Sequence, residues 1–313
     1  MCTSIAFYGK KFLFGRNMDI EYSFGECVTL TPRSFRLRFA AEPPQPRHYA
    51  MLGIASKNPD FPLYAEAFNE KGLCAAGLNF PQSARYARVR AGGKHNVQAG
   101  EMIAFVLSQC ESVSQAKTLL QNTCVIAEDG GLPPAPLHWA FADDSRCIVA
   151  EPMENGLCVY ENPVGVLTNE PPFPVQFASL NSYVHLSAEF PKNSFAKNGL
   201  PLAAPGVGSG AVGLPGDAGS PSRFVRAAFY LQNSGADEGV PHFFHLLSSV
   251  EMPRGGVLTR GGVPDYTRYG CCIDAAAEKY YLKTYGSLSV QTFGMSEKEG
   301  DALQFSDIAA EKA

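Results

Sequence analysis

The chain has no long hydrophobic run, no strongly basic region and no closely spaced cysteine pairs, and each absence narrows its class. No apolar stretch approaches the ~20 residues that a membrane-spanning helix needs. The N-terminus lacks a basic segment followed by an apolar one, so we expect no signal peptide. The net charge is −4, and the densest basic cluster is the short segment Arg85–Arg90. We therefore expect neither a membrane nor a nucleic acid as a partner.

Cysteine usage and ligand spacing exclude further classes. The nine cysteines are an odd number and form no Cys-x-x-Cys pair, unlike the framework of a small secreted protein. We expect most of them to be reduced and buried, which favours a cytoplasmic location. His242 and His245 are three residues apart but have no Glu or Cys at ligand spacing, so no metal site or cofactor is predicted.

Two short apolar runs at the N-terminus flank a glycine-containing turn and predict a β-hairpin over residues 2–19. If Tyr8 pairs with Lys11, then Cys2 lies opposite Asn17; a slip of one residue places Cys2 opposite Met18. In either register, the start of the chain lies beside Arg16, Asn17 and Asp19.

The second residue has the chemistry of an N-terminal nucleophile. Cys2 is small enough for Met1 to be removed, which would leave Cys2 with a free α-amine. An α-amine has an ordinary pKa of about 7.7–8.0 and a thiol one of about 8.5, so one residue would supply both a base and a nucleophile near neutral pH. A carboxylate such as Asp19 can hold the amine, and a cation such as Arg16 favours the thiolate.

In the rest of the chain, the sequence predicts a series of strands, then helices in two pairs with further strands between them, and finally more strands. This order predicts an α+β protein with two packed sheets and helices outside. Strands are expected at residues 27–31, 35–40, 51–56, 64–68, 73–80, 137–142, 147–151, 157–160, 165–168, 267–273, 279–285 and 288–292. Helices are expected at residues 100–110, 112–121, 173–186, 222–231 and 240–252, with Ser112 and Ser220 as N-caps.

Seven segments together resemble the choloylglycine hydrolase family, which comprises bile salt hydrolases and penicillin V acylases. The segments occur in order over essentially the whole chain, which the resemblance treats as a single domain over residues 1–313. They are Cys2, residues 14–19, residues 69–73, residues 77–80, residues 165–169, residues 214–217 and residues 222–224. The resemblance implies a four-layer αββα N-terminal-nucleophile hydrolase fold, with two stacked antiparallel sheets flanked by helices.

The resemblance also implies roles for individual residues. Cys2 resembles the nucleophile and Asp19 the residue that holds its amine, whereas Arg16 and Arg223 resemble the cations that flank the thiolate. Asn79 and Asn169 resemble the pair that completes the oxyanion hole and orients the N-terminus. These roles suit the chemistry, because asparagine amides donate hydrogen bonds to an oxyanion without titrating.

Asparagine at position 79 favours bile salt hydrolases, since penicillin V acylases tend to carry tyrosine there. The implied substrates are bile salts conjugated to glycine or taurine, and a gut bacterium is the implied source. A steroid needs an apolar cleft, for which Met18, Ile20, Phe61 and Leu132 are the candidate residues. Members of the family also tend to be homotetramers.

Three alternatives stay open at this stage. The same machinery could serve a penicillin V acylase or an N-acyl-homoserine-lactone acylase. The fold could also belong to a binding protein without catalysis, such as a steroid carrier. A cysteine protease would instead need a catalytic histidine, for which His138, His185, His242 and His245 are the candidates.

Overall fold

The N-terminal hairpin lies in the middle of a six-stranded antiparallel sheet. Its strands are β1 (Cys2–Tyr8) and β2 (Phe12–Asp19), joined by the three-residue turn at Gly9–Lys11. Tyr8 pairs with Phe12 and Cys2 with Met18, so the second of the two expected registers is the one observed. The structure is a computed structural model and describes residues 1–127, 135–195 and 198–308.

The six-stranded sheet pairs the N-terminal strands with strands from the C-terminal part of the chain. Its strand order is β12-β1-β2-β13-β14-β15, and every neighbouring pair is antiparallel. Its other strands are β12 (Val166–Leu167), β13 (Thr267–Asp274), β14 (Lys279–Thr284) and β15 (Gln291–Gly294). Gly15 on β2 faces Cys271 on β13 so closely that a Cβ atom there would lie 1.9 Å from the Cys271 carbonyl oxygen. Only glycine fits this close approach.

The second sheet has eight antiparallel strands in the order β11-β10-β9-β6-β5-β4-β3-β16. The strands are β3 (Glu26–Thr31), β4 (Met51–Ser56), β5 (Tyr64–Asn69), β6 (Cys74–Asn79), β9 (Leu137–Ala142), β10 (Cys147–Met153), β11 (Gly156–Glu161) and β16 (Gln304–Ser306). β6 contacts β1 and β2, so the two sheets pack face to face.

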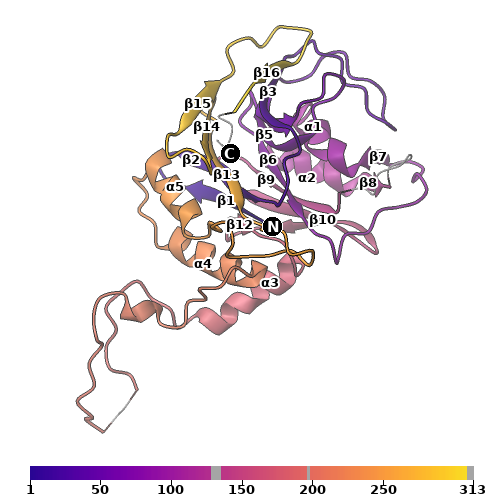
Figure 1. Cartoon of the computed structure of the whole chain (residues 1–313). Helices are drawn as coiled ribbons and strands as arrows, with labels where there is room; N and C mark the ends of the chain where they lie inside the picture. Colours follow the sequence, from indigo (N-terminus) through magenta and orange to yellow (C-terminus); the bar gives the residue numbers. More distant parts are fainter. Residues whose placement is uncertain (128–134, 196–197, 309–313) are drawn as a thin grey trace.

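Helices cover the outer face of each sheet, which completes four layers (Figure 1). On the eight-stranded sheet lie α1 (Met102–Leu107), preceded by a 3₁₀ turn at Ala99–Glu101, and α2 (Val113–Gln121). On the six-stranded sheet lie α4 (Ser220–Gln232) and α5 (Val240–Ser248). The short α3 (Phe173–Ser179) continues into a 3₁₀ turn at Leu180–Tyr183. The expected α+β architecture of two antiparallel sheets flanked by helices is confirmed.

The predicted strand at residues 35–40 is wrong. Phe35, Leu37 and Phe39 alternate with arginines as in a strand, and all three are buried. The segment is nevertheless a loop with a single bridge, between Leu37 and Gln45. Prolines 43, 44 and 46 remove the donors that a partner strand would need. The alternation instead lets Phe39 pack edge-on against Phe105 of α1, with ring centroids 5.6 Å apart.

The helices occur where they are predicted, but several begin or end at different residues. Ser112 caps α2 as predicted, since its Oγ accepts a hydrogen bond from the Gln115 backbone nitrogen. Ser220, however, is not the N-cap of α4; Gly219 occupies that position. The helix predicted over residues 173–186 ends as an α-helix at Ser179, and the one predicted over residues 240–252 ends at Ser248.

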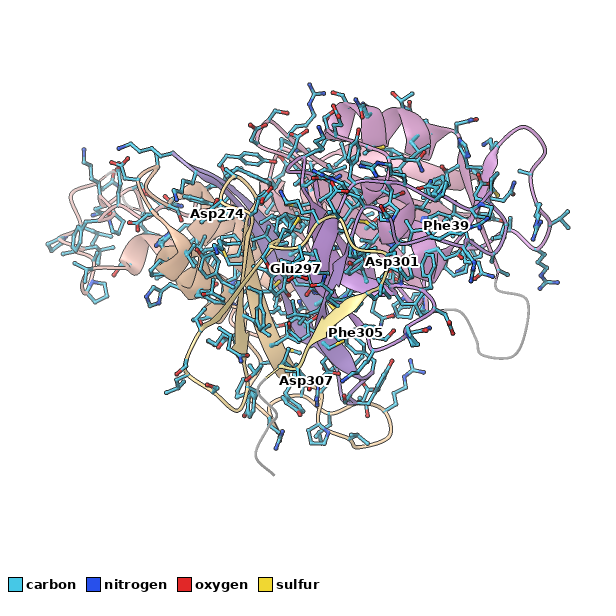
Figure 2. The ribbon with its side chains drawn as sticks, turned by 90° about the horizontal axis from the view of Figure 1, so that it is seen from above. Phe39, Asp274, Glu297, Asp301, Phe305 and Asp307 are labelled. Atoms are coloured by element: carbon cyan, nitrogen blue, oxygen red, sulfur yellow. The ribbon has the colours of Figure 1, made fainter. Side chains whose placement is uncertain are left out.

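Three strands are missing from the predictions because each has only three or four residues. β7 (His95–Gln98) and β8 (Thr123–Ile126) form a small parallel pair beside α1 and α2. β16 forms the edge of the eight-stranded sheet. Figure 2 shows Phe305 on this strand lying against the strands of the N-terminal half, and Phe305 pairs with Thr29 of β3.

A long segment between α3 and α4 projects away from both sheets (Figure 1). We call its described residues, 184–195 and 198–212, the arm. The arm exposes several large apolar side chains: Val184, Phe190, Phe195, Leu200, Leu202, Val207 and Val212. Among the described residues, no helix combines the length and apolar character needed to cross a bilayer.

Candidate active site

Cys2 begins the central strand β1 and is almost fully buried, at 4% exposure. Its sulfur lies 4.0 Å from the sulfur of Met18, its cross-strand neighbour on β2. Its backbone nitrogen donates a hydrogen bond to Asn169 Oδ1 at 2.8 Å. All nine cysteines are unpaired and seven of them are buried, as expected for reduced thiols.

Asn169 uses every atom of its side-chain amide. Oδ1 accepts hydrogen bonds from the Cys2 nitrogen and from Arg223 Nη2, both at 2.8 Å. Nδ2 donates to the backbone oxygen of Asn79 at 2.8 Å. The backbone nitrogen of Asn169 donates to Ser220 Oγ. Ser220 is therefore used to hold Asn169 rather than to cap its own helix.

Arg223 is fully buried in the first turns of α4 and connects three segments of the site. It donates to the Cys2 carbonyl oxygen, to the Thr3 hydroxyl and to Asn169 Oδ1. Burial lowers the pKa of Arg223 from its ordinary value, and the charges of Asp19 and Cys2 only partly oppose that shift. The stable position of this cation thus depends on the negative groups around it.

Asp19, at the end of β2, is the buried carboxylate nearest to Arg223. Its Oδ1 accepts a hydrogen bond from Thr267 at 2.6 Å, and its Oδ2 lies 3.9 Å from Arg223 Nη1. Oδ2 makes no hydrogen bond within the described part of the chain. Burial raises the pKa of Asp19, whereas Arg223 and the terminal amine lower it less strongly. Met1 lies alongside, because its carbonyl oxygen accepts from the Asp19 nitrogen at 2.9 Å.

Arg16 is fully buried between the two sheets. Nη1 donates to the Gly77 carbonyl oxygen at 2.6 Å, and Nη2 lies 3.4 Å from the sulfur of Met18. Burial acts to lower the pKa of Arg16, but electrostatic interactions, including those with Cys2 and Glu66, outweigh burial and leave the pKa raised. The Cys2 sulfur and Arg16 Nη2 thus share Met18 Sδ as a neighbour, at 4.0 Å and 3.4 Å.

Glu66 lies behind Arg16, on the eight-stranded sheet. It is fully buried, 3.7 Å from Arg16 Nη1, and accepts hydrogen bonds from the hydroxyls of Tyr269 at 2.9 Å and Tyr280 at 2.6 Å. Burial raises the pKa of Glu66 despite the opposing charge of Arg16. Two sheets thus meet at a buried ion pair beside the nucleophile.

The six predicted catalytic residues gather around one point. Five of them are buried: Cys2, Arg16, Asp19, Asn169 and Arg223. Asn79 is the exception: its backbone oxygen is held by Asn169, but its side chain is exposed and makes no hydrogen bond to the described residues.

The predicted substrate-binding residues are placed less uniformly. Met18 lies against the Cys2 sulfur, and Ile20 is half-buried one residue beyond Asp19. Phe61 is in the outer core, where its ring packs against Phe39 with centroids 5.4 Å apart. Leu132 lies outside the described residues.

The candidate histidines of a cysteine protease do not approach the nucleophile. His185 and His245 are exposed, and His242 bonds Ser234. His138 is fully buried, with both ring nitrogens bonded to Glu151 and Thr168. Within the described chain, the only hydrogen-bond partner of the Cys2 sulfur is Met18. No cluster of metal-binding side chains occurs among these residues either.

Sequence reasoning missed the residues that support the site: Glu66, His138, Glu151 and Ser220. His138 and Ser220 were noticed, but for other roles. Both glutamates lie in strands made mostly of apolar residues. A charged residue in such a strand is the one sequence signal that could have indicated a buried, paired carboxylate.

The comparisons with known proteins agree with this geometry. Residues 2–306 match the family described as linear amide C–N hydrolases, choloylglycine hydrolase family. The chain belongs to the choloylglycine hydrolase family. It is 41% identical to a bile salt hydrolase/transferase from Lactiplantibacillus plantarum, over 97% of this chain and 95% of the relative. A bile salt hydrolase/transferase from Clostridium perfringens is 36% identical, over 96% and 94% of the two chains.

Solved structures of similar proteins have the same fold as this chain. A variant of conjugated bile acid hydrolase from Clostridium perfringens superimposes with a TM-score of 0.92 and 34% identity, covering 99% of this chain and 97% of that one. The penicillin V acylase from Agrobacterium tumefaciens has a TM-score of 0.78 at 21% identity, covering 99% and 93%, and so shares the fold. The chain is a choloylglycine hydrolase-family amide hydrolase with the N-terminal-nucleophile fold.

Proposed function

We propose that this family member hydrolyses the amide bond of glycine- and taurine-conjugated bile salts, with Cys2 as the nucleophile once Met1 has been removed. The observation that carries the proposal is the position of Cys2: its nitrogen is held by Asn169 and its carbonyl oxygen by the buried Arg223. Its sulfur lies beside Met18, which the buried Arg16 also contacts. Relatives that are 32–41% identical and named for bile salt or bile acid hydrolysis support the substrate class. No cofactor takes part in the proposed reaction.

In the first step, the α-amine of Cys2 takes the proton of the thiol, and the sulfur attacks the carbonyl carbon of the amide. The carbonyl oxygen becomes an oxyanion. When this intermediate collapses, the C–N bond breaks and the ammonium of Cys2 returns its proton to the leaving amine of glycine or taurine. A thioester between Cys2 and the bile acid remains. Water then gives a proton to the α-amine and attacks the thioester, which restores the thiol and releases the acid.

The surroundings of Cys2 suit these proton transfers. Arg16 and Arg223 favour the thiolate because both carry positive charge in a buried setting. Asp19 Oδ2 is a buried acceptor without a hydrogen bond among the described residues, which suits it to hold the amine of the processed chain. The proposal therefore treats Cys2 and Asp19 as one functional unit.

The two asparagines take different parts in the proposed mechanism. Asn169 Oδ1 accepts from Cys2 and Arg223, and Nδ2 gives one of its two hydrogens to Asn79, so we assign to Asn169 the orientation of the N-terminus. We assign donation to the oxyanion to the exposed Asn79 side chain, which has no hydrogen bond to the described residues. A donor aimed at an oxyanion typically lowers the barrier by about 2.7–4 kcal/mol.

The steroid of the substrate needs an apolar surface beside the nucleophile. We propose that Met18 and Ile20 contribute to it, since Met18 contacts the Cys2 sulfur and Ile20 follows on the same strand end. Phe61 and Leu132 stay predictions of the resemblance.

Turnover of glycocholate, taurocholate and penicillin V by the processed enzyme tests the function. We expect cleavage of both bile salts and loss of all activity in Cys2→Ala, without a change in folding. Rapid penicillin V cleavage with inert bile salts would reverse the assignment. N-terminal mass measurement should find Cys2 first in active protein, because a chain that keeps Met1 has no α-amine on Cys2.

We also propose that the protein is a homotetramer in solution and resides in the cytoplasm. The arm supports the assembly, since it extends from the body and carries exposed apolar side chains. Contiguous exposed apolar surface is typical of protein interfaces.

A further inference from the structure

A buried histidine lies behind the group around Cys2. His138 on β9 is fully buried, with Nδ1 3.0 Å from Glu151 Oε1 and Nε2 2.9 Å from the Thr168 carbonyl oxygen. Its imidazole ring also stacks on Phe80, with centroids 4.2 Å apart and planes inclined by 7°. None of these groups takes part in the mechanism above.

The partners of His138 adjoin the two asparagines of the site. Thr168 directly precedes Asn169, and Phe80 directly follows Asn79. The first pair follows β12 of the six-stranded sheet and the second ends β6 of the eight-stranded sheet. One side chain therefore holds the strand ends of both sheets at the place where Asn169 bonds Asn79.

Strand register explains why these groups meet. β6 and β9 pair Leu78 with His138, so Phe80 is the diagonal neighbour of His138 on the same face. β9 and β10 pair Trp139 with Ala150, which places the next residue, Glu151, beside His138. Glu151 Oε1 also accepts from the nitrogen of Phe173 at the start of α3.

Both contacts of the ring need a hydrogen. A neutral imidazole carries one N–H, yet both ring nitrogens of His138 face oxygen atoms. A neutral ring beside an ionised carboxylate can therefore make only one of the two hydrogen bonds. The second needs one more proton, carried either by the ring or by Glu151. Glu151 therefore does more than fill space, because its carboxyl group is the partner that lets the second ring nitrogen make a hydrogen bond.

We propose that His138, paired with Glu151, is a positioning residue for the hydrolase reaction: it fixes the backbone at Asn79 and Asn169, and through them the oxyanion donor and the N-terminus. This inference rests on the proposed function. Errors of about 1 Å in the placement of reacting groups can cost about 10²-fold in rate. A mere structural role would instead lower stability and leave turnover of the folded protein unchanged.

The chain offers a matched control for such a structural role. His48 is also buried, and its ring nitrogens lie 2.7 Å and 2.8 Å from the carbonyl oxygens of Tyr49 and Phe35. Those partners belong to the loop before β4, and the site does not include them. His48→Phe and His138→Phe each remove two short nitrogen–oxygen contacts of a buried imidazole, and His138→Phe keeps an aromatic ring against Phe80.

The experiment compares wild type, His138→Phe, Glu151→Gln and His48→Phe at equal folded concentration. It measures kcat and KM on the best amide substrate of the wild type, and the rate at which iodoacetamide alkylates Cys2, followed by mass of the N-terminal peptide. We expect kcat to fall about 10²-fold in His138→Phe and Glu151→Gln but not in His48→Phe. Alkylation should change much less than kcat, because it forms no oxyanion and the charges beside the sulfur are untouched.

Two results would overturn the inference: a kcat for His138→Phe equal to that of His48→Phe, or an alkylation rate that falls in proportion to kcat. If His138→Phe does not fold, the isosteric Glu151→Gln carries the same test. Failure of the proposed function shows separately, as wild-type protein that does not cleave bile salts.

Discussion

Asn169 Oδ1 lies 2.8 Å from the backbone nitrogen of Cys2, although 167 residues separate the two in the chain. Because the same oxygen also binds Arg223, replacing Asn169 by Ala releases both partners together. We expect kcat for a conjugated bile salt to fall about 10²-fold. Asn17→Ala is the control, since Asn17 is equally buried but its amide bonds Leu247 instead. Equal loss of kcat in both variants would show that burial alone matters.

Arg223 and Arg226 provide a matched pair on α4. Both donate to backbone carbonyls, Arg223 to Cys2 and Arg226 to Ser249, but only Arg223 faces the nucleophile. We expect Arg223→Gln to slow iodoacetamide alkylation of Cys2 at neutral pH, because the thiolate loses a buried cation. Arg226→Gln should leave the rate as in wild type. The idea of two cations flanking the thiolate fails if Arg223→Gln reacts as fast as wild type.

Glu66 should give the stability of the protein a distinctive pH dependence. Burial raises its pKa above the unfolded value of about 4.3, so the folded state binds this proton more tightly than the unfolded state. The resulting stabilisation is complete below that value and is lost as the pH rises through the raised pKa. Relative to Glu66→Gln, which cannot titrate, wild type should therefore become less stable as the pH rises above about 4.

Glu70 should give the stability of the protein the opposite pH dependence, and so serves as a comparison. Although burial acts to raise its pKa, hydrogen bonds from Arg33 and Ala50 outweigh this and lower it. Wild type should thus gain stability over Glu70→Gln as the pH rises through the lowered pKa of Glu70. Urea unfolding of the three proteins, from well below pH 4 upward, measures both trends. Parallel curves for Glu66→Gln and Glu70→Gln would refute the assignment of Glu66.

Part of the site could be predicted locally because it lies on one hairpin, whereas the roles of Asn79, Asn169 and Arg223 followed only from the family resemblance. The hairpin pattern placed Cys2 beside Arg16 and Asp19, and left open only a slip of one residue. The observed register pairs Cys2 with Met18, because the turn has three residues rather than two. The local sequence does not determine the length of the turn, because Gly9 and the two lysines after it suit a two-residue turn and a three-residue turn equally.

The supporting residues could not be predicted because their partners are distant in sequence. Glu66 meets Tyr269 and Tyr280 only when the two sheets stack. Ser220 has the local signature of an N-cap, yet its hydroxyl serves Asn169, 51 residues earlier. Tertiary hydrogen bonds outweighed local propensity at both places.

The arm gives a prediction on assembly. If its apolar residues lie in an interface of the proposed tetramer, then Phe190→Ser and Val207→Ser together should reduce the mass measured by light scattering. These side chains are 58% and 95% exposed, so the substitutions should not lower the stability of the isolated subunit. A wild-type protein that is monomeric at assay concentration would exclude the tetramer.

Gly15 tests whether the close contact between β2 and β13 holds the nucleophile strand in place. In Gly15→Ala the new methyl group would lie 1.9 Å from the Cys271 carbonyl oxygen, so the strands must separate. Overpacking of this kind typically costs about 1–3 kcal/mol. We expect a lower melting temperature and a lower kcat together, because β2 carries Arg16 and Asp19. Gly92→Ala is the control, since a Cβ there meets nothing within 4 Å. An unchanged melting temperature in Gly15→Ala would mean that the two strands do not approach as closely as described.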